Sequence, residues 1–164
     1  MKKTTVSIIA LFVCFTAFCQ YDTTPPYLRT KQQPDFNLLT LDSTVFTQAV
    51  LKENTRTVIM LFNPECGHCQ AQLETLLAIT DITQTAQLVL TSTETLAKLK
   101  IFYDKNHLQK YPNIILGKDY KYFFGGYYQP KTIPVLAFYN AAKQLVFFNQ
   151  GNVSKKQVLK ALKL

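Results

Sequence analysis

The feature that most constrains the fold is a continuous apolar, β-favouring run from Thr57 to Phe62. A run without a polar face suits a central strand that is covered on both sides, as in parallel sheets. Asn63-Pro64 breaks the run, and apolar residues then recur near helical spacing. This pattern predicts a helix from about Cys66 to Ile79, so a buried strand leads directly into a helix.

The other patterns alternate strands with helices. We expect strands at 36–41, 86–90, 135–139 and 145–148, and helices at 43–50, at about 96–102 and after Ser154. We expect one short element and loops in the stretch 105–131, which is rich in Gly, Pro and Tyr. This order predicts an α/β fold with a mixed central sheet flanked by helices.

The N-terminus predicts export. Lys2 and Lys3 precede an apolar run, Val6–Phe18, that is too short to span a membrane but suits a secretory signal. We expect a signal peptide at 1–19, an extended linker at 20–34 and one domain at 35–164. Lipidation of Cys19 is the second processing route, and it would tether the protein to a membrane. A buried N-terminal helix is the less favoured alternative.

The cysteine count points to chemistry rather than to cross-linking. Of the four cysteines, Cys14 and Cys19 lie in the expected signal peptide, which leaves Cys66 and Cys69 in the mature chain. Export implies an oxidising compartment. A disulfide that closes so short a loop adds little stability through chain entropy.

Charge and composition exclude some classes of protein. Hydrophobic residues make up 48% of the chain, which is enough to fill a core. The formal net charge is +8, but the basic residues are scattered and form no stripe that would indicate a nucleic-acid partner.

The segment Cys66-Gly67-His68-Cys69 carries the predicted chemistry. A cysteine at a helix N-terminus faces unpaired N–H groups and the positive end of the helix dipole, and both stabilise a thiolate. We expect Cys66 to attack a substrate disulfide and Cys69 to resolve the mixed disulfide. Gly67 would let a substrate chain approach and would adopt the required backbone angles freely. Protonated His68 would favour the Cys66 thiolate, and Glu65 would oppose it.

The residues from Val58 to Cys69 resemble the active-site strand and helix of thioredoxin-like proteins, a three-layer sandwich fold. Lys131–Phe138 resembles the second signature of that superfamily, which implies that Pro134 is cis and lies against Cys66, and that the Ile133 backbone pairs with substrate. Pro34–Leu38 is similar to the entry strand of exported reductases, including those of cytochrome c maturation. The Cys-Gly-His-Cys motif is like that of protein disulfide isomerases.

The sequence departs from this superfamily at three positions. Glu65 stands where thioredoxin has a tryptophan, and Met60 where it buries an aspartate. Gln72 stands where the cytochrome-maturation reductases carry a glutamate, and we expect Glu74 to point outward. No buried proton acceptor for Cys69 is evident, which argues against efficient reduction. The isomerase-like motif favours oxidation or isomerisation, and both directions of electron flow stay open at this point.

We therefore expect a thiol–disulfide oxidoreductase that acts on exported proteins, without a cofactor or a bound metal. Its partners would be protein thiols and disulfides and an upstream redox protein, and we expect a monomer. The alternative is a non-enzymatic binding module, either an adaptor or a metal carrier with Cys66, Cys69, His68 and His107 as ligands. The aromatic stretch around Tyr127 and Tyr128 is expected to be part core and part loop cover, with a substrate-gripping rim as the second interpretation.

Overall fold

The computed structural model describes residues 23–163. In this part of the chain the strands form one seven-stranded sheet in the order β2-β1-β5-β4-β3-β6-β7. The strands are β1 (Asn37–Thr40), β2 (Val45–Thr47), β3 (Thr57–Leu61), β4 (Gln87–Ser92), β5 (Ile114–Lys118), β6 (Val135–Tyr139) and β7 (Leu145–Gln150). The helices are α1 (Pro26–Thr30), α2 (Gly67–Leu77), α3 (Thr80–Gln84), α4 (Leu96–Lys105), α5 (Phe123–Tyr128) and α6 (Lys155–Ala161).

Strand β3 is the buried centre of the sheet, as its apolar run predicts. All five of its residues are buried. It pairs in parallel with β4 and antiparallel with β6, and β4 pairs in parallel with β5. The sheet is therefore mixed, and the predicted α/β class is confirmed.

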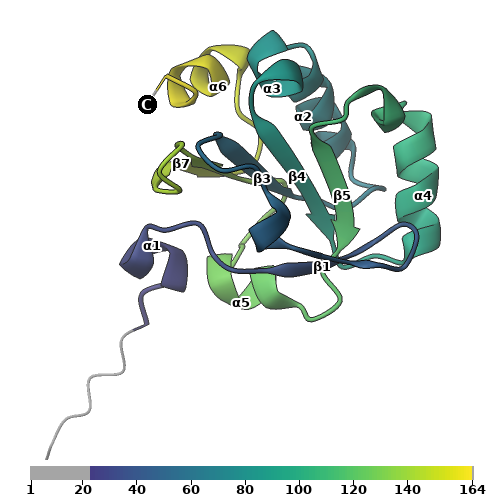
Figure 1. Cartoon of the computed structure of the whole chain (residues 1–164), viewed down its shortest axis with the longest axis horizontal. Helices are drawn as coiled ribbons and strands as arrows, with labels where there is room; N and C mark the ends of the chain where they lie inside the picture. The colour runs from purple at the N-terminus through teal and green to yellow at the C-terminus, as the bar shows by residue number, and fades with distance from the viewer. Residues whose placement is uncertain (1–22, 164) are drawn as a thin grey trace, which may run out of the picture.

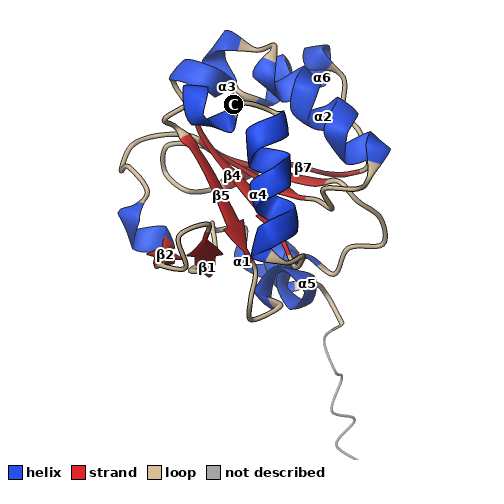
Figure 2. Cartoon of the chain, turned by 90° about the vertical axis from the view of Figure 1, so that its right-hand side faces the viewer, coloured by secondary structure: helices blue, strands red, loops and turns tan. Residues whose placement is uncertain are grey.

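Helices cover both faces of the sheet (Figures 1 and 2). Alternate residues of β3 point to opposite faces, so Met60 belongs to the core beneath α2, α3, α4 and α6, whereas Ile59 belongs to the core beneath α1 and α5. The result is three layers, with the sheet in the middle. Ser154 caps α6 through a capping box with Gln157, which confirms the predicted cap.

The predicted helix at 43–50 is wrong. Ser43 has a left-handed φ of 64° and lies in a tight turn, where the Asp42 carboxylate accepts hydrogen bonds from Thr40 and Thr44. The chain then reverses and Val45–Thr47 pairs with β1 as β2, before one 3₁₀ turn at Gln48–Val50. Strand pairing with β1 outweighs the weak helical pattern in this short segment.

The expected extended linker at 20–34 contains a helix, α1. Its Tyr27 ring stacks on Phe148 of β7 at a centroid distance of 4.1 Å, and the Gln33 N–H donates to the Lys143 carbonyl at 2.7 Å. These contacts bind the segment to the domain, so this part of the expected linker is neither extended nor detached. The predicted signal peptide at 1–19 lies outside the described residues, and no described helix is long and apolar enough to cross a bilayer.

The stretch 105–131 holds more structure than the expected short element. It contains a 3₁₀ turn at Leu108–Lys110, strand β5 and helix α5. A Cβ at Gly117 of β5 would lie 2.6 Å from the Cβ of Leu38, so the close approach of β1 requires glycine there. Asp119 begins the turn into α5, and its carboxylate accepts the N–H groups of Phe123 and Phe124 at 2.9 Å.

The aromatic stretch is part core and part cover, as expected. Tyr128 is fully buried and its hydroxyl pairs with that of Tyr139 at 2.7 Å. The Tyr127 hydroxyl donates to the Gln32 carbonyl at 2.8 Å. These two tyrosines therefore hold the core and the α1 segment together, and the second interpretation, a substrate-gripping rim, remains a prediction.

Candidate active site

The two cysteines lie where the sequence places them, between β3 and α2. Cys66 is the N-cap of α2 and is partly exposed, and its Sγ accepts the Cys69 N–H at 3.4 Å. Cys69 is completely buried under the first turn of the helix. Both thiols are free. One sulfur is therefore open to solvent and the other is sealed beside it.

The surroundings of Cys66 favour its thiolate. Partial burial alone would raise the pKa of Cys66. Hydrogen bonds from the Cys69 thiol and from the backbone N–H groups of Cys69 and His68 outweigh that effect and lower the pKa. These donors belong to the first turn of α2, as expected for a thiol at a helix N-terminus.

Cys69 has the opposite character. Burial raises its pKa to about 12, and the neighbouring Cys66 adds to that increase, although a backbone hydrogen bond from Asn63 works against it. Met60 and Gln72, on β3 and α2, are buried without exposure to solvent and carry no charge. The Gln72 Oε1 accepts the Val153 N–H at 2.6 Å, while its Nε2 has no hydrogen-bond partner among the described residues.

Asn63 organises the loop that carries Cys66, although the sequence analysis treats it only as a strand breaker. Its carbonyl accepts the Cys66 N–H at 3.1 Å, and its side-chain Oδ1 accepts the Glu65 N–H at 2.8 Å. Its Nδ2 donates to the Glu94 carboxylate at 3.0 Å. An Asx turn of this kind is a recognisable sequence signal, because Asn readily bonds the backbone two residues on.

Glu65 is paired rather than free. Its carboxylate lies 2.9 Å from the Lys98 Nζ, which also pairs with Glu94 at 3.2 Å. The hydrogen bond to Glu65 raises the pKa of Lys98. Glu65 thus lies against a cation from α4 that the sequence gives no means of placing. Its predicted opposition to the Cys66 thiolate remains a prediction.

Gly67 and His68 meet their predictions only in part. Gly67 begins α2 without a left-handed φ, and a Cβ there would touch nothing within 4 Å. The missing side chain therefore leaves open space beside Cys66, but the backbone conformation at this position does not require glycine. His68 is exposed, and its carbonyl accepts the Asn152 Nδ2 at 3.0 Å. The tuning role of its imidazole remains a prediction.

The Ile133–Pro134 peptide bond is cis, as the resemblance implies. The antiparallel register pairs Leu61 with Val135, so Pro134 lies beside the end of β3, from which the Cys66 loop departs. Ile133 is partly buried and packs against the same core cluster as Cys66.

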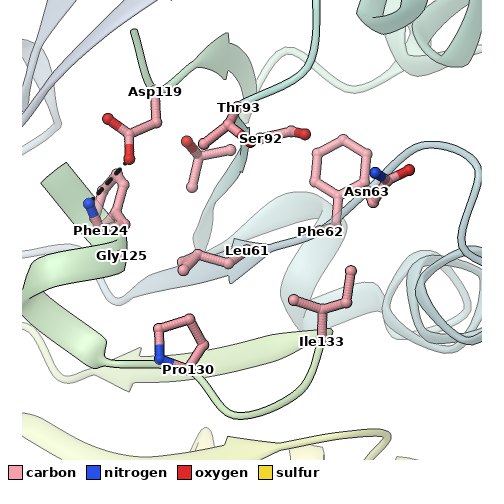
Figure 3. A pocket seen from close by; sticks show the side chains of 11 residues that line it. Leu61, Phe62, Asn63, Ser92, Thr93, Asp119, Phe124, Gly125, Pro130 and Ile133 are labelled. Carbon is pink, nitrogen blue, oxygen red and sulfur yellow. Dashed lines mark hydrogen bonds between the residues drawn. The ribbon is translucent and has the colours of Figure 1, made fainter. Parts of the chain in front are cut away.

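A pocket of about 210 Å³ opens next to this loop (Figure 3). Its walls come from the end of β3, the end of β4, helix α5 and the segment that leads to Pro134. The lining residues are Leu61, Phe62, Asn63, Thr91, Ser92, Thr93, Asp119, Phe124, Gly125, Pro130 and Ile133. The sequence analysis did not identify this pocket, because its walls are far apart in the chain.

The metal-carrier alternative finds no ligand cluster. Within residues 23–163, no group of three or more His, Cys, Asp and Glu side chains is placed to hold a metal ion. His107, one of the four candidate ligands, lies at the start of the Leu108–Lys110 turn, beyond α4.

Comparison with solved structures identifies the architecture. No family model matches the sequence, and no curated protein sequence does. A secreted disulfide oxidoreductase of Mycobacterium tuberculosis, homologous to E. coli DsbE, superposes with a TM-score of 0.64 at 20% identity, over 80% of this chain and 95% of that one. The chain has a thioredoxin-like fold.

Two further thioredoxin-like neighbours agree. The pneumococcal exposed lipoprotein thioredoxin Etrx1 of Streptococcus pneumoniae matches with a TM-score of 0.63 at 19% identity, over 79% of this chain and 98% of that one. StoA from Bacillus subtilis matches with a TM-score of 0.59 at 16% identity, over 79% and 96% of the two chains.

Proposed function

We propose that this protein is an exported thiol–disulfide oxidoreductase that works through Cys66 and Cys69. The observation that carries the proposal is the arrangement of the two cysteines. Cys66, at the N-cap of α2, is partly exposed and has a lowered pKa, and its Sγ accepts the backbone N–H of the buried Cys69. A thiolate that is both ionised and accessible is the nucleophile of disulfide exchange.

The exchange has two steps. The Cys66 thiolate attacks a substrate disulfide, forms a mixed disulfide and releases one substrate sulfur as a thiolate. Cys69 then loses its proton and attacks Cys66 Sγ, which releases the second substrate thiol and leaves a Cys66–Cys69 disulfide. The substrate gains two electrons, and an upstream redox protein restores the dithiol. The same steps in reverse oxidise a substrate dithiol.

The segment before β6 provides a site for the substrate chain. Within the described residues, the Ile133 backbone makes no hydrogen bond, and it lies one residue before the cis proline at the edge of the cysteine loop. We propose that Ile133 pairs with the substrate backbone and that Pro134 lies against Cys66. An extended substrate would then cross the site beside the exposed sulfur.

The buried surroundings of Cys69 favour oxidation or isomerisation over reduction. Neither Met60 nor Gln72 can take the proton that Cys69 must lose before it resolves a mixed disulfide. Slow resolution gives a mixed disulfide at Cys66 time to rearrange or to be released by another thiol.

Export rests on the basic, apolar start of the chain and on the compartment of its structural neighbours. One neighbour is described as secreted and another as an exposed lipoprotein. We propose the periplasm or cell envelope as the location, with cleavage after Cys19 preferred to its lipidation.

Insulin reduction in the presence of an electron donor tests the function. The wild-type protein should turn over, Cys66→Ser should be inactive, and Cys69→Ser should accumulate a mixed disulfide. Turnover that survives in Cys66→Ser would refute the proposal. The equilibrium potential against glutathione then gives the direction, because reductases lie near about −270 mV and isomerases near about −180 mV.

A further inference from the structure

We propose that the pocket beside the cysteine loop binds a tyrosine side chain of the substrate protein, close to the cysteine that reacts. This inference rests on the proposed exchange function and adds the substrate class. It depends on the size of the pocket, on its apolar walls, and on the unpaired hydroxyl of a residue in its wall.

The position of the pocket connects it to the reacting sulfur. The carbonyl of Asn63, in the pocket wall, accepts the Cys66 N–H, and Ile133, which also lines the pocket, precedes the cis proline. A substrate chain that pairs with the Ile133 backbone therefore passes the mouth of the pocket. A side chain a short distance from its cysteine can enter.

The size and walls of the pocket fit an aromatic ring. Its volume is about 210 Å³, and an apolar cavity of about 150 Å³ is enough to bind benzene. Leu61, Phe62, Phe124, Pro130 and Ile133 supply apolar walls. In Figure 3 the Asp119 carboxylate and the side chains of Ser92 and Thr93 lie across the pocket from Pro130 and Ile133. The cavity thus has an apolar side and a polar side.

Thr91 gives the pocket an unsatisfied polar group. It follows Val89 on β4 by two residues, so it faces the α5 side of the sheet, where the pocket lies. Thr91 is 1% exposed, and its Oγ1 has no hydrogen-bond partner in the part of the chain that the structure describes. Buried hydroxyls are nearly always paired, so an orphan hydroxyl in a cavity wall indicates a missing partner.

Asp119 supplies a second acceptor. The residue is 2% exposed, and within residues 23–163 its carboxylate receives only the two N–H groups of Phe123 and Phe124. A carboxylate has about four lone-pair positions, so it can accept another hydrogen bond. A phenol hydroxyl can donate to the Asp119 carboxylate and accept from the Thr91 hydroxyl, whereas a phenylalanine ring can do neither.

The glycines of α5 provide a matched pair of variants. Gly125 lines the pocket, whereas Gly126, its neighbour on the same helix, does not. Among the described residues, a Cβ at either position would touch nothing within 4 Å, so the first atom of a side chain meets no clash at either. Gly125→Leu should fill the pocket, and Gly126→Leu should leave it open.

Binding of p-cresol and toluene to the reduced protein, followed by NMR titration, tests the pocket without any redox step. We expect p-cresol to bind roughly tenfold more tightly than toluene, because one net hydrogen bond contributes about that factor. Thr91→Val should remove most of the difference while folding as stably as the wild type, since its hydroxyl has no partner to lose. Equal binding of the two ligands, or equal losses in Gly125→Leu and Gly126→Leu, would overturn the proposal.

Peptide kinetics test the substrate class. The substrates are short peptides whose single cysteine forms a mixed disulfide with thionitrobenzoate. In each peptide, one of the two positions before or the two positions after that cysteine carries Tyr, Phe, Lys or Ala. Cys66 attacks the peptide sulfur and releases coloured thionitrobenzoate. At one position the tyrosine peptide should react roughly tenfold faster than the phenylalanine peptide. A preference for Lys, or no preference at any position, would overturn the proposal. No reaction with any peptide while p-cresol still binds would instead refute the exchange function.

Discussion

The contrast between the two thiols leads to a quantitative prediction about alkylation. In Cys69→Ser the exposed Cys66 remains, and in Cys66→Ser only the buried Cys69 does. Raising the pKa of Cys69 from 9.0 to about 12 lowers its thiolate fraction at neutral pH about a thousandfold. A more basic thiolate is a better nucleophile, and this recovers a factor of roughly 20 to 30.

The net expectation is that Cys69 reacts with iodoacetamide about 40-fold more slowly than Cys66. Burial, the largest cause of the raised Cys69 pKa, persists when Cys66 is replaced, and Cys69 has no exposed surface. The backbone N–H groups of residues 68 and 69 still favour the Cys66 thiolate when the Cys69 thiol is gone. Mass spectrometry of the two reduced variants over a time course gives both rates. In urea the two variants should react alike, which controls for the chemistry of the reagent. Native rates within a few-fold of each other would refute the assignment of Cys69 as the sealed thiol.

Two further predictions concern the packing that supports the site. Tyr128→Phe leaves the buried Tyr139 hydroxyl unpaired and should lower the free energy of unfolding by about 1–3 kcal/mol. Adding Tyr139→Phe should restore part of that loss. Urea melts in which the two losses add would contradict the pairing of the hydroxyls. Gly117→Ala places a Cβ 2.6 Å from that of Leu38 and should cost about 1–3 kcal/mol, while Gly126→Ala, in open space, should be neutral or stabilising in the same melts.

Local patterns were sufficient for the central part of the fold. The uniform apolar run of β3 and the helical spacing after Cys66 each keep one repeat over the whole length of the element. The cis bond before Pro134 also follows from local sequence, through its resemblance to a known signature. Such features are predictable because neighbours along the chain determine them.

The errors fall where distant segments decide the structure. The residues 45–47 have a weak helical pattern, but β1 offers them strand hydrogen bonds. The α1 segment contains prolines typical of a linker, yet Tyr27 finds a ring partner on β7. Gly117 in β5 resembles a loop residue until Leu38 is seen against it. No local pattern contains these partners.

The active site divides in the same way. The two cysteines and their helix could be predicted, because a motif carries them. The Lys98 partner of Glu65 and the pocket beneath Asn63 could not, because their members come from β3, β4, α4 and α5. Chemistry that resides in a motif is visible in sequence, whereas chemistry that depends on its surroundings needs the fold.

A single residue, Asn63, contacts the backbone at Cys66, the thiol of Cys69 and the carboxylate that faces Lys98. The reactivities of the two sulfurs are consequently not independent variables. The groups that Asn63 turns toward the two cysteines are its own carbonyl and N–H, which every residue type possesses. A substitution at this position therefore reaches the two sulfurs only by displacing the loop, and such a displacement changes the partners of both at once.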